Sequence, residues 1–80
     1  MNKDEDARNE ALFGPAAKFS DHKPGETIRF MYADRPVTGL ITWVAAPGQT
    51  ASGKHTPLTY FCSVAGEHIP IQVYETEILR

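Results

Sequence analysis

The side chains with the clearest chemical potential lie near the C-terminus, in the stretch His68–Tyr74. Read with the period of two of a β-strand, this stretch places the amide of Gln72 and the phenol of Tyr74 on one face. The opposite face is apolar and is predicted to face a core; its members are Ile69, Ile71 and Val73. The polar face is therefore a candidate contact surface. The simpler interpretation is a half-buried strand with one solvated face, and both stay open on pattern alone.

The neighbours of this stretch limit what it could do. Pro70 has no backbone N–H to give to a sheet, so it predicts an edge strand or a strand end. The nearest acids, Glu67 and Glu75, have the opposite parity to Gln72 and Tyr74. No general acid is expected beside the amide.

A second pattern, Gly48–Lys54, fits the spacing G-x-x-x-x-G-K of a phosphate-binding loop. That motif needs a following helix, whose N-terminal N–H groups bind the phosphates, and a Ser or Thr for magnesium. Here His55 takes the place of the Ser or Thr, and Pro57 prevents a helix from growing. The pattern instead predicts a mobile hairpin loop.

Charge and composition narrow the class of protein. Residues 1–14 hold two basic and four acidic side chains, whereas residues 15–80 hold six of each, so the net charge of −2 belongs to the N-terminal segment. Without a basic stripe, nucleic acid is an unlikely partner. The three histidines lack the spacing of a metal site. One cysteine and no long apolar run favour a cytoplasmic protein without a membrane span. That cysteine, Cys62, lies in the apolar run Tyr60-Phe61-Cys62 and is expected to be a small core residue.

The elements that must position these residues are short strands. Turn residues recur about every ten positions, which is typical of an all-β fold. We therefore predict a single-domain SH3-like barrel of about five strands over residues 12–80, after a flexible acidic tail at 1–11 and with no convincing helix. A short helical turn around Asp6–Leu12 stays open, although it would be marginal alone. The expected strands are Thr27–Tyr32, Val37–Ala45, Leu58–Val64, the stretch at 68–74, and a closing turn or strand at Glu75–Arg80.

Several side chains are assigned to the core by the same alternation. Ile41 and Trp43 are expected on one face of their strand. Gly39, in mid-strand, predicts a bulge, a bend or a close backbone approach. Phe13 and Phe19 are expected to be buried at the two ends of a segment that crosses the barrel, and Ile78 and Leu79 to pack inward at the end of the chain.

Several markers, taken in order, resemble a known family. Ile71-Gln-Val-Tyr74 is similar to the Val-Gln-Ile-Tyr strand of the plasmid-type II dihydrofolate reductases, the trimethoprim-insensitive enzymes built on an SH3-like barrel. Thr56-Pro57 with Tyr60 resembles that family's Thr-Pro-x-x-Tyr, and Gly25–Arg29 resembles its Gly-Asp-Arg-Val-Arg. The resemblance spans about residues 12–80.

This resemblance implies a homotetramer in which dihydrofolate and NADPH meet in one central pore. It implies that Gln72 binds both rings, that Ile71 and Val73 belong to the cofactor-binding strand, and that the backbone of Val73 binds the nicotinamide and the pterin. Tyr74 would contact the cofactor, and the proton would come from solvent or from substrate that is already protonated. Two positions depart from the family. Phe30 or Met31 stands where a lysine lines the pore mouth, and Val37 stands at the place of an interface tryptophan, although Trp43 lies close. Arg29 is then the candidate for substrate binding.

A different class of protein also fits the sequence. A Tudor-like or SH3-like binding module could use exposed aromatic side chains to hold a peptide, a methylated cation or a nucleic acid. The candidates for that role are Tyr32, Trp43, Phe61 and Tyr74.

Overall fold

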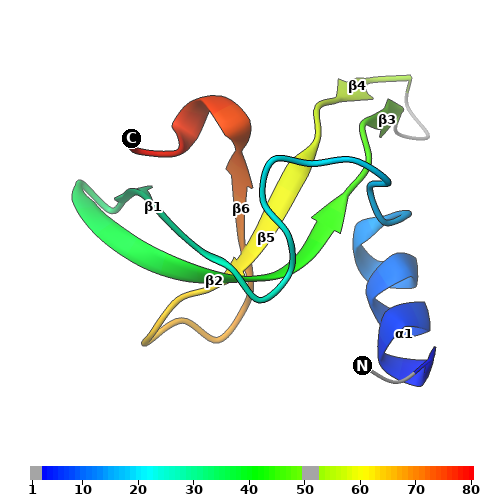
Figure 1. The fold of residues 1–80 in the computed structure, drawn as a ribbon, viewed down its shortest axis with the longest axis horizontal. Coiled ribbons are helices and arrows are strands. Elements are labelled where there is room, and N and C mark those ends of the chain that lie inside the picture. The colour runs from blue at the N-terminus through cyan, green and yellow to red at the C-terminus, as the bar shows by residue number, and fades with distance from the viewer. Residues whose placement is uncertain (1–2, 50–52) are drawn as a thin grey trace.

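The computed structural model describes residues 3–49 and 53–80 as one helix, six strands and a closing 3-10 turn (Figure 1). In chain order these elements are α1 (Lys3–Phe13), β1 (Thr27–Tyr32), β2 (Arg35–Ala45), β3 (Gly48–Gln49), β4 (His55–Thr56), β5 (Thr59–Ser63), β6 (Ile71–Tyr74) and η1 (Glu75–Glu77). Strands dominate, and the expected all-β fold is confirmed.

The main sheet is antiparallel, in the order β1-β2-β5-β6, and it curls into a half-barrel. In Figure 1 the long β2 bends as it passes from its pairing with β1 to its pairing with β5. The C-terminal residues then return to β1, where Ile78 forms a bridge with Phe30 and the Leu79 N–H donates to the Arg29 carbonyl at 2.8 Å. This return brings the two ends of the sheet together around one core.

The β1–β2 connection is a two-residue hairpin. Ala33 and Asp34 have φ values of 54° and 64°, and Tyr32 pairs with Arg35. Two successive residues with positive φ form the tight turn that matches the twist of paired strands. The second strand therefore begins at Arg35, two residues before the expected start at Val37.

A bulge in β2 divides its side chains between the two faces of the sheet. The register shifts between Ile41, which pairs with Cys62, and Trp43, which pairs with Phe61. Ile41 joins the barrel core, whereas Trp43 joins a separate buried cluster with Ala45 and Phe61. The expectation that Ile41 and Trp43 share a face is wrong, because the extra residue at the bulge reverses the alternation.

The barrel core is built from alternate residues of four strands. Tyr60 and Cys62 are its most enclosed members, so the expectation that Cys62 is a core residue is confirmed. The Tyr60 hydroxyl donates to Glu75 Oε2 at 2.6 Å, which ties β5 to η1. The buried residues of the core are Ile28, Phe30, Ile41, Val44, Tyr60, Cys62, Val64 and Val73.

The N-terminal segment is helical, so the prediction of a chain without a convincing helix is wrong. Asp4, Glu5 and Asp6 occupy the first turn of α1, where their negative charges interact favourably with the positive end of the helix dipole and stabilise the helix. The helix ends at Gly14, whose φ of +96° is typical of a C-terminal cap and whose N–H donates to the Glu10 carbonyl at 2.9 Å. The residues of α1 lack an apolar stripe, so hydrophobic periodicity gave no signal for it.

Three further expectations fail for local reasons. Phe19 lies on a loop and is 87% exposed. Leu79 is 41% exposed, because it follows η1 at the rim and only Ile78 packs against the core. Ile69 is 70% exposed, because β6 begins only after Pro70.

The pattern at Gly48–Lys54 has hairpin strands around it. Gly48 and Gln49 pair with Thr56 and His55, as β3 and β4, on either side of positions 50–52, which lie outside the described residues. A strand, β5, follows where a nucleotide-binding loop would need a helix. The expected hairpin is confirmed. None of the helical segments in residues 3–49 and 53–80 has the length and apolar character of a membrane span.

Gly39 makes the close approach that its mid-strand position predicted. A Cβ atom there would lie 2.8 Å from Cys62 Cβ and 2.9 Å from Phe30 Cε1. We expect Gly39→Ala to lower the free energy of unfolding by about 1–3 kcal/mol, since a packed core resists added volume. Urea unfolding measures this, with the exposed Thr38→Ala as a neighbouring control. A Gly39→Ala variant as stable as the control would contradict the packing described here.

Stability should fall at high pH. Burial, reinforced by the hydrogen bond to Glu75, raises the pKa of Tyr60 to about 12, and burial raises the pKa of Cys62 to about 11. Both groups lose protons more easily in the unfolded chain, so their contribution is complete below pH ~9 and is lost as pH rises towards ~12. In urea titrations from about pH 8 to pH 11, Tyr60→Phe should flatten the decline above pH ~10. Cys62→Ala should flatten the part that begins nearer pH ~9. An unchanged pH dependence in Tyr60→Phe would contradict this assignment.

Candidate functional site

The strand β6 presents the predicted polar face outward. Gln72 and Tyr74 are exposed, whereas Val73 between them is 1% exposed and belongs to the core. Gln72 pairs with Phe61 of β5, and Tyr74 pairs with Thr59. Within the described sheet β6 pairs with β5 alone, so the structure brings the amide and the phenol to an outer strand of the barrel.

These two side chains line a groove of about 700 Å³ on the outer face of the sheet. One wall comes from the end of α1, where Phe13 packs on Phe61 with ring centroids 4.4 Å apart. Another wall is the segment before β6, which includes the exposed Ile69. The described residues that line the groove are Leu12, Phe13, Gly14, Pro15, Ala45, Ala46, Gly48, Thr56, Thr59, Phe61, Ile69, Pro70, Gln72 and Tyr74.

The groove is apolar and uncharged. No Asp, Glu, Lys or Arg is found among the lining residues that the structure describes. Glu75, the nearest acid in sequence, turns to the other side, where it accepts from Tyr60 and pairs with Arg80 at 3.2 Å. Among the lining residues within 3–49 and 53–80, the polar side chains are two threonines, the Gln72 amide and the Tyr74 phenol. The site can therefore bind a flat polar ring or an apolar side chain, and these residues include no carboxylate, histidine or lysine for acid–base catalysis.

Arg29, the basic side chain that was expected to bind substrate, lies away from the groove. Arg29 is exposed on β1, and no β1 residue lines the groove. Phe30, one of the two residues at the position of the pore-mouth lysine, is 2% exposed and serves the core; Met31, the other, is 53% exposed. The structure of one chain therefore does not bring Arg29 to Gln72.

The four aromatic candidates for a binding module do not form one cage. Phe61 and Trp43 belong to the outer cluster, and Phe61 lines the groove together with Tyr74. Tyr32 lies at the β1–β2 turn, where the carboxylate of Glu67 and partial burial raise its pKa. Because Tyr32 lies at this turn and not at the groove, the four aromatic side chains do not form a single binding site.

The sequence predicted that Phe13 would be buried, and its side chain is half-buried against Phe61, but it did not predict that Phe13 would end a helix at the site. Phe13 forms a wall of the groove, and the Trp43 Nε1–H donates to the Gly14 carbonyl at 3.1 Å. The available signals were an acidic first turn and the stop Gly14-Pro15, which are typical of a helix start and end. Within the described chain, no three His, Cys, Asp or Glu side chains lie together in a way that could hold a metal ion.

Comparisons of the chain with protein-family models, with curated proteins and with solved structures gave no match. The resemblance to the type II dihydrofolate reductases therefore stays a prediction from sequence. The half-barrel itself is shown by the coordinates.

The attachment of α1 should depend on Phe13 rather than on the rest of the helix. We expect Phe13→Ala to lower the free energy of unfolding by about 1–3 kcal/mol, because a half-buried ring and its contact with Phe61 are lost. Deleting residues 1–11 keeps Phe13 and should shift the melting temperature by no more than about 2 °C, less than 1 kcal/mol in a domain of this size. Thermal unfolding of both variants tests this. A deletion as costly as Phe13→Ala would mean that the polar turns of α1 also stabilise the barrel.

Proposed function

We propose that the chain reduces dihydrofolate with NADPH in a pore that a homotetramer forms around the outer face of β6. The observation that carries the proposal is the exposure of Gln72 and Tyr74 on one face, at an apolar groove that a single chain leaves open. The resemblance of Ile71–Tyr74 and its flanking markers to the type II reductases supplies the reaction.

Assembly is required by size. The chain measures 32 × 30 × 23 Å, and its interior is filled by the core. Two ligands as large as NADPH and dihydrofolate do not fit inside such a barrel, and sites for them arise at symmetry axes between copies. Exposed apolar side chains at the groove, Leu12 and Ile69, favour contact with another copy.

The residues of the groove suit the rings better than the phosphates. The Gln72 amide has donors and acceptors for the edges of a nicotinamide or a pterin, and the Tyr74 phenol can contact the cofactor. No cation lines the groove among the described residues, so the phosphates are left to Arg29 or Arg35, both exposed outside it.

NADPH supplies the hydride when it is bound, and the protein's part is to hold the two rings together in an environment that excludes water. With no carboxylate at the groove, the proton comes from solvent or arrives with the substrate. Catalysis then rests on position rather than on a general acid.

The decisive variant is Gln72→Leu. Because Gln72 faces away from the core, the variant should keep the stability and the assembly of the wild type. It should lose NADPH oxidation with dihydrofolate in the presence of trimethoprim by about tenfold or more, since ring groups lose partners worth roughly 1–3 kcal/mol. Tyr74→Phe should mainly raise the KM for NADPH.

The matched control is Thr38→Leu, an exposed strand position outside the groove, which should leave activity unchanged. Sedimentation and the NADPH assay are measured on all four proteins. A tetramer in which Gln72→Leu is as active as the wild type contradicts the proposal.

A binding module that takes an apolar peptide is the second candidate, and the uncharged groove favours it. A wild-type monomer without NADPH oxidation would select this function over the reductase. In that case Phe61, Ile69 and Tyr74 would form the contact surface.

A further inference from the structure

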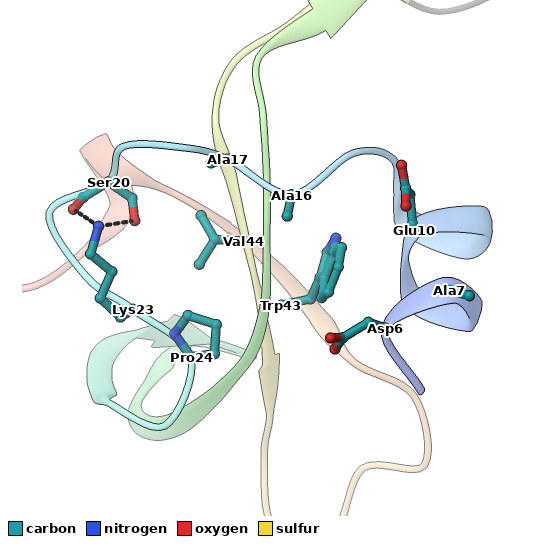
Figure 2. Close-up of a pocket in the computed structure, with 10 residues that line it drawn as sticks. All are labelled: Asp6, Ala7, Glu10, Ala16, Ala17, Ser20, Lys23, Pro24, Trp43 and Val44. Carbon is teal, nitrogen blue, oxygen red and sulfur yellow. Dashed lines mark hydrogen bonds between the residues drawn. The ribbon is translucent and has the colours of Figure 1, made fainter. Parts of the chain in front are cut away.

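A second hollow, of about 510 Å³, lies between α1, the segment that leads to β1, and β2 (Figure 2). Its apolar surface comes from Trp43, Val44 and Ala17. Asp6 and Glu10 contribute carboxylates from α1, and Lys23 lies across the hollow. It shares no lining residue with the groove at Gln72.

The carboxylate of Asp6 has an unsatisfied oxygen at this hollow. Its Oδ1 is buried and has no hydrogen-bond partner within the described chain. Figure 2 shows the Asp6 carboxylate extending from α1 towards Trp43. Asp6 as a residue is half-buried, but this oxygen has lost its contact with water without gaining a hydrogen bond, which is unfavourable for a carboxylate. A bound cation would restore the missing interaction.

Glu10 adds a second negative charge one helical turn from Asp6, at a spacing that places both on the same side of α1. The ion pairs His22–Glu26 and Glu75–Arg80 involve neither Asp6 nor Glu10. Lys23 is held away from them, because its Nζ donates to the Ser20 carbonyl at 3.0 Å and to Ser20 Oγ at 3.4 Å (Figure 2). The α1 side of the hollow is therefore negative and unpaired.

Trp43 gives this side an aromatic surface. Its Nε1–H is already used by the Gly14 carbonyl, so the indole offers the hollow its π system rather than a hydrogen bond. Tryptophan is the best cation–π partner among the side chains, and an indole beside carboxylates is the arrangement that selects alkylammonium head groups.

We propose that this hollow binds an alkylammonium group, with its positive head between Asp6 and Trp43 and its apolar stem along Val44 and Ala17. The inference is independent of the reductase proposal, because its residues lie outside the groove. It also differs from a cage of four aromatic residues, since the cation would be bound by one indole and two carboxylates of α1.

Trp43 is the single tryptophan of the chain, so its fluorescence reports binding directly. Choline is titrated against its uncharged isostere, 3,3-dimethylbutan-1-ol, with the wild-type protein. We expect choline to saturate the signal with a Kd of about 1 mM or tighter and the isostere to bind at least tenfold more weakly. Nα-acetyl-trimethyllysine amide carries the same head group. Tighter binding of choline would indicate a free cation as the natural ligand, and tighter binding of the lysine derivative would indicate a protein side chain.

Variants then identify the carboxylates. Asp6→Asn should weaken choline binding by about tenfold, or 1.4 kcal/mol, and Glu10→Gln should weaken it by a smaller factor. Asp4→Asn is the matched control, because it removes the same charge from an exposed position of α1 that does not line the hollow. It should change the Kd by less than about twofold.

The proposal is overturned if neither cation binds, if the isostere binds as well as choline, or if Asp6→Asn and Asp4→Asn have equal affinity. The chain that lacks residues 1–11 gives an independent check, since it has neither carboxylate. Its binding of choline with wild-type affinity would also overturn the proposal.

Discussion

The bulge in β2 is the constraint on which the rest of this structure depends. Without it, Ile41 and Trp43 would lie on the same face, and one of them would leave the layer it now occupies. With it, Ile41 completes the barrel core, and Trp43 lies outside, against α1. A single inserted residue thus places these two side chains of β2 on opposite buried faces of the sheet.

The outer cluster of Trp43, Ala45 and Phe61 explains why α1, which has no apolar stripe, packs at one position on the sheet. Only the end of α1 carries an aromatic anchor, Phe13, which packs on Phe61, while the Gly14 carbonyl accepts from Trp43. The remaining turns are polar and mostly exposed. The Phe13–Phe61 contact and the Trp43–Gly14 hydrogen bond therefore hold the C-terminal end of α1 against the sheet, together with the backbone pairing of Pro15–Ala17 with the end of β2. The acidic turns of α1 line the hollow that Trp43 borders.

The two hollows differ in charge because different parts of α1 reach them. The groove receives the apolar C-terminal end of the helix and contains an amide and a phenol but no charged lining residue among those described. The other hollow receives Asp6 and Glu10 and a lysine that is hydrogen-bonded elsewhere. The first suits a neutral ring or an apolar side chain, and the second suits a cation, so one outer face offers two distinct chemistries.

Strand positions, the tight turns and the exposure of Gln72 and Tyr74 followed from the sequence alone, because alternation and turn residues are local properties of the chain. The core role of Cys62 and the close approach at Gly39 followed in the same way. The placement of Trp43 did not, since a register shift is set by the pairing of two strands. The sequence indicated at most a short helical turn around Asp6–Leu12, because the contacts that hold the full helix lie at its end and leave no apolar periodicity along it. The approach of Asp6 to Trp43 was likewise decided only by tertiary structure, because it joins residues 37 positions apart through the docking of α1 on the outer layer.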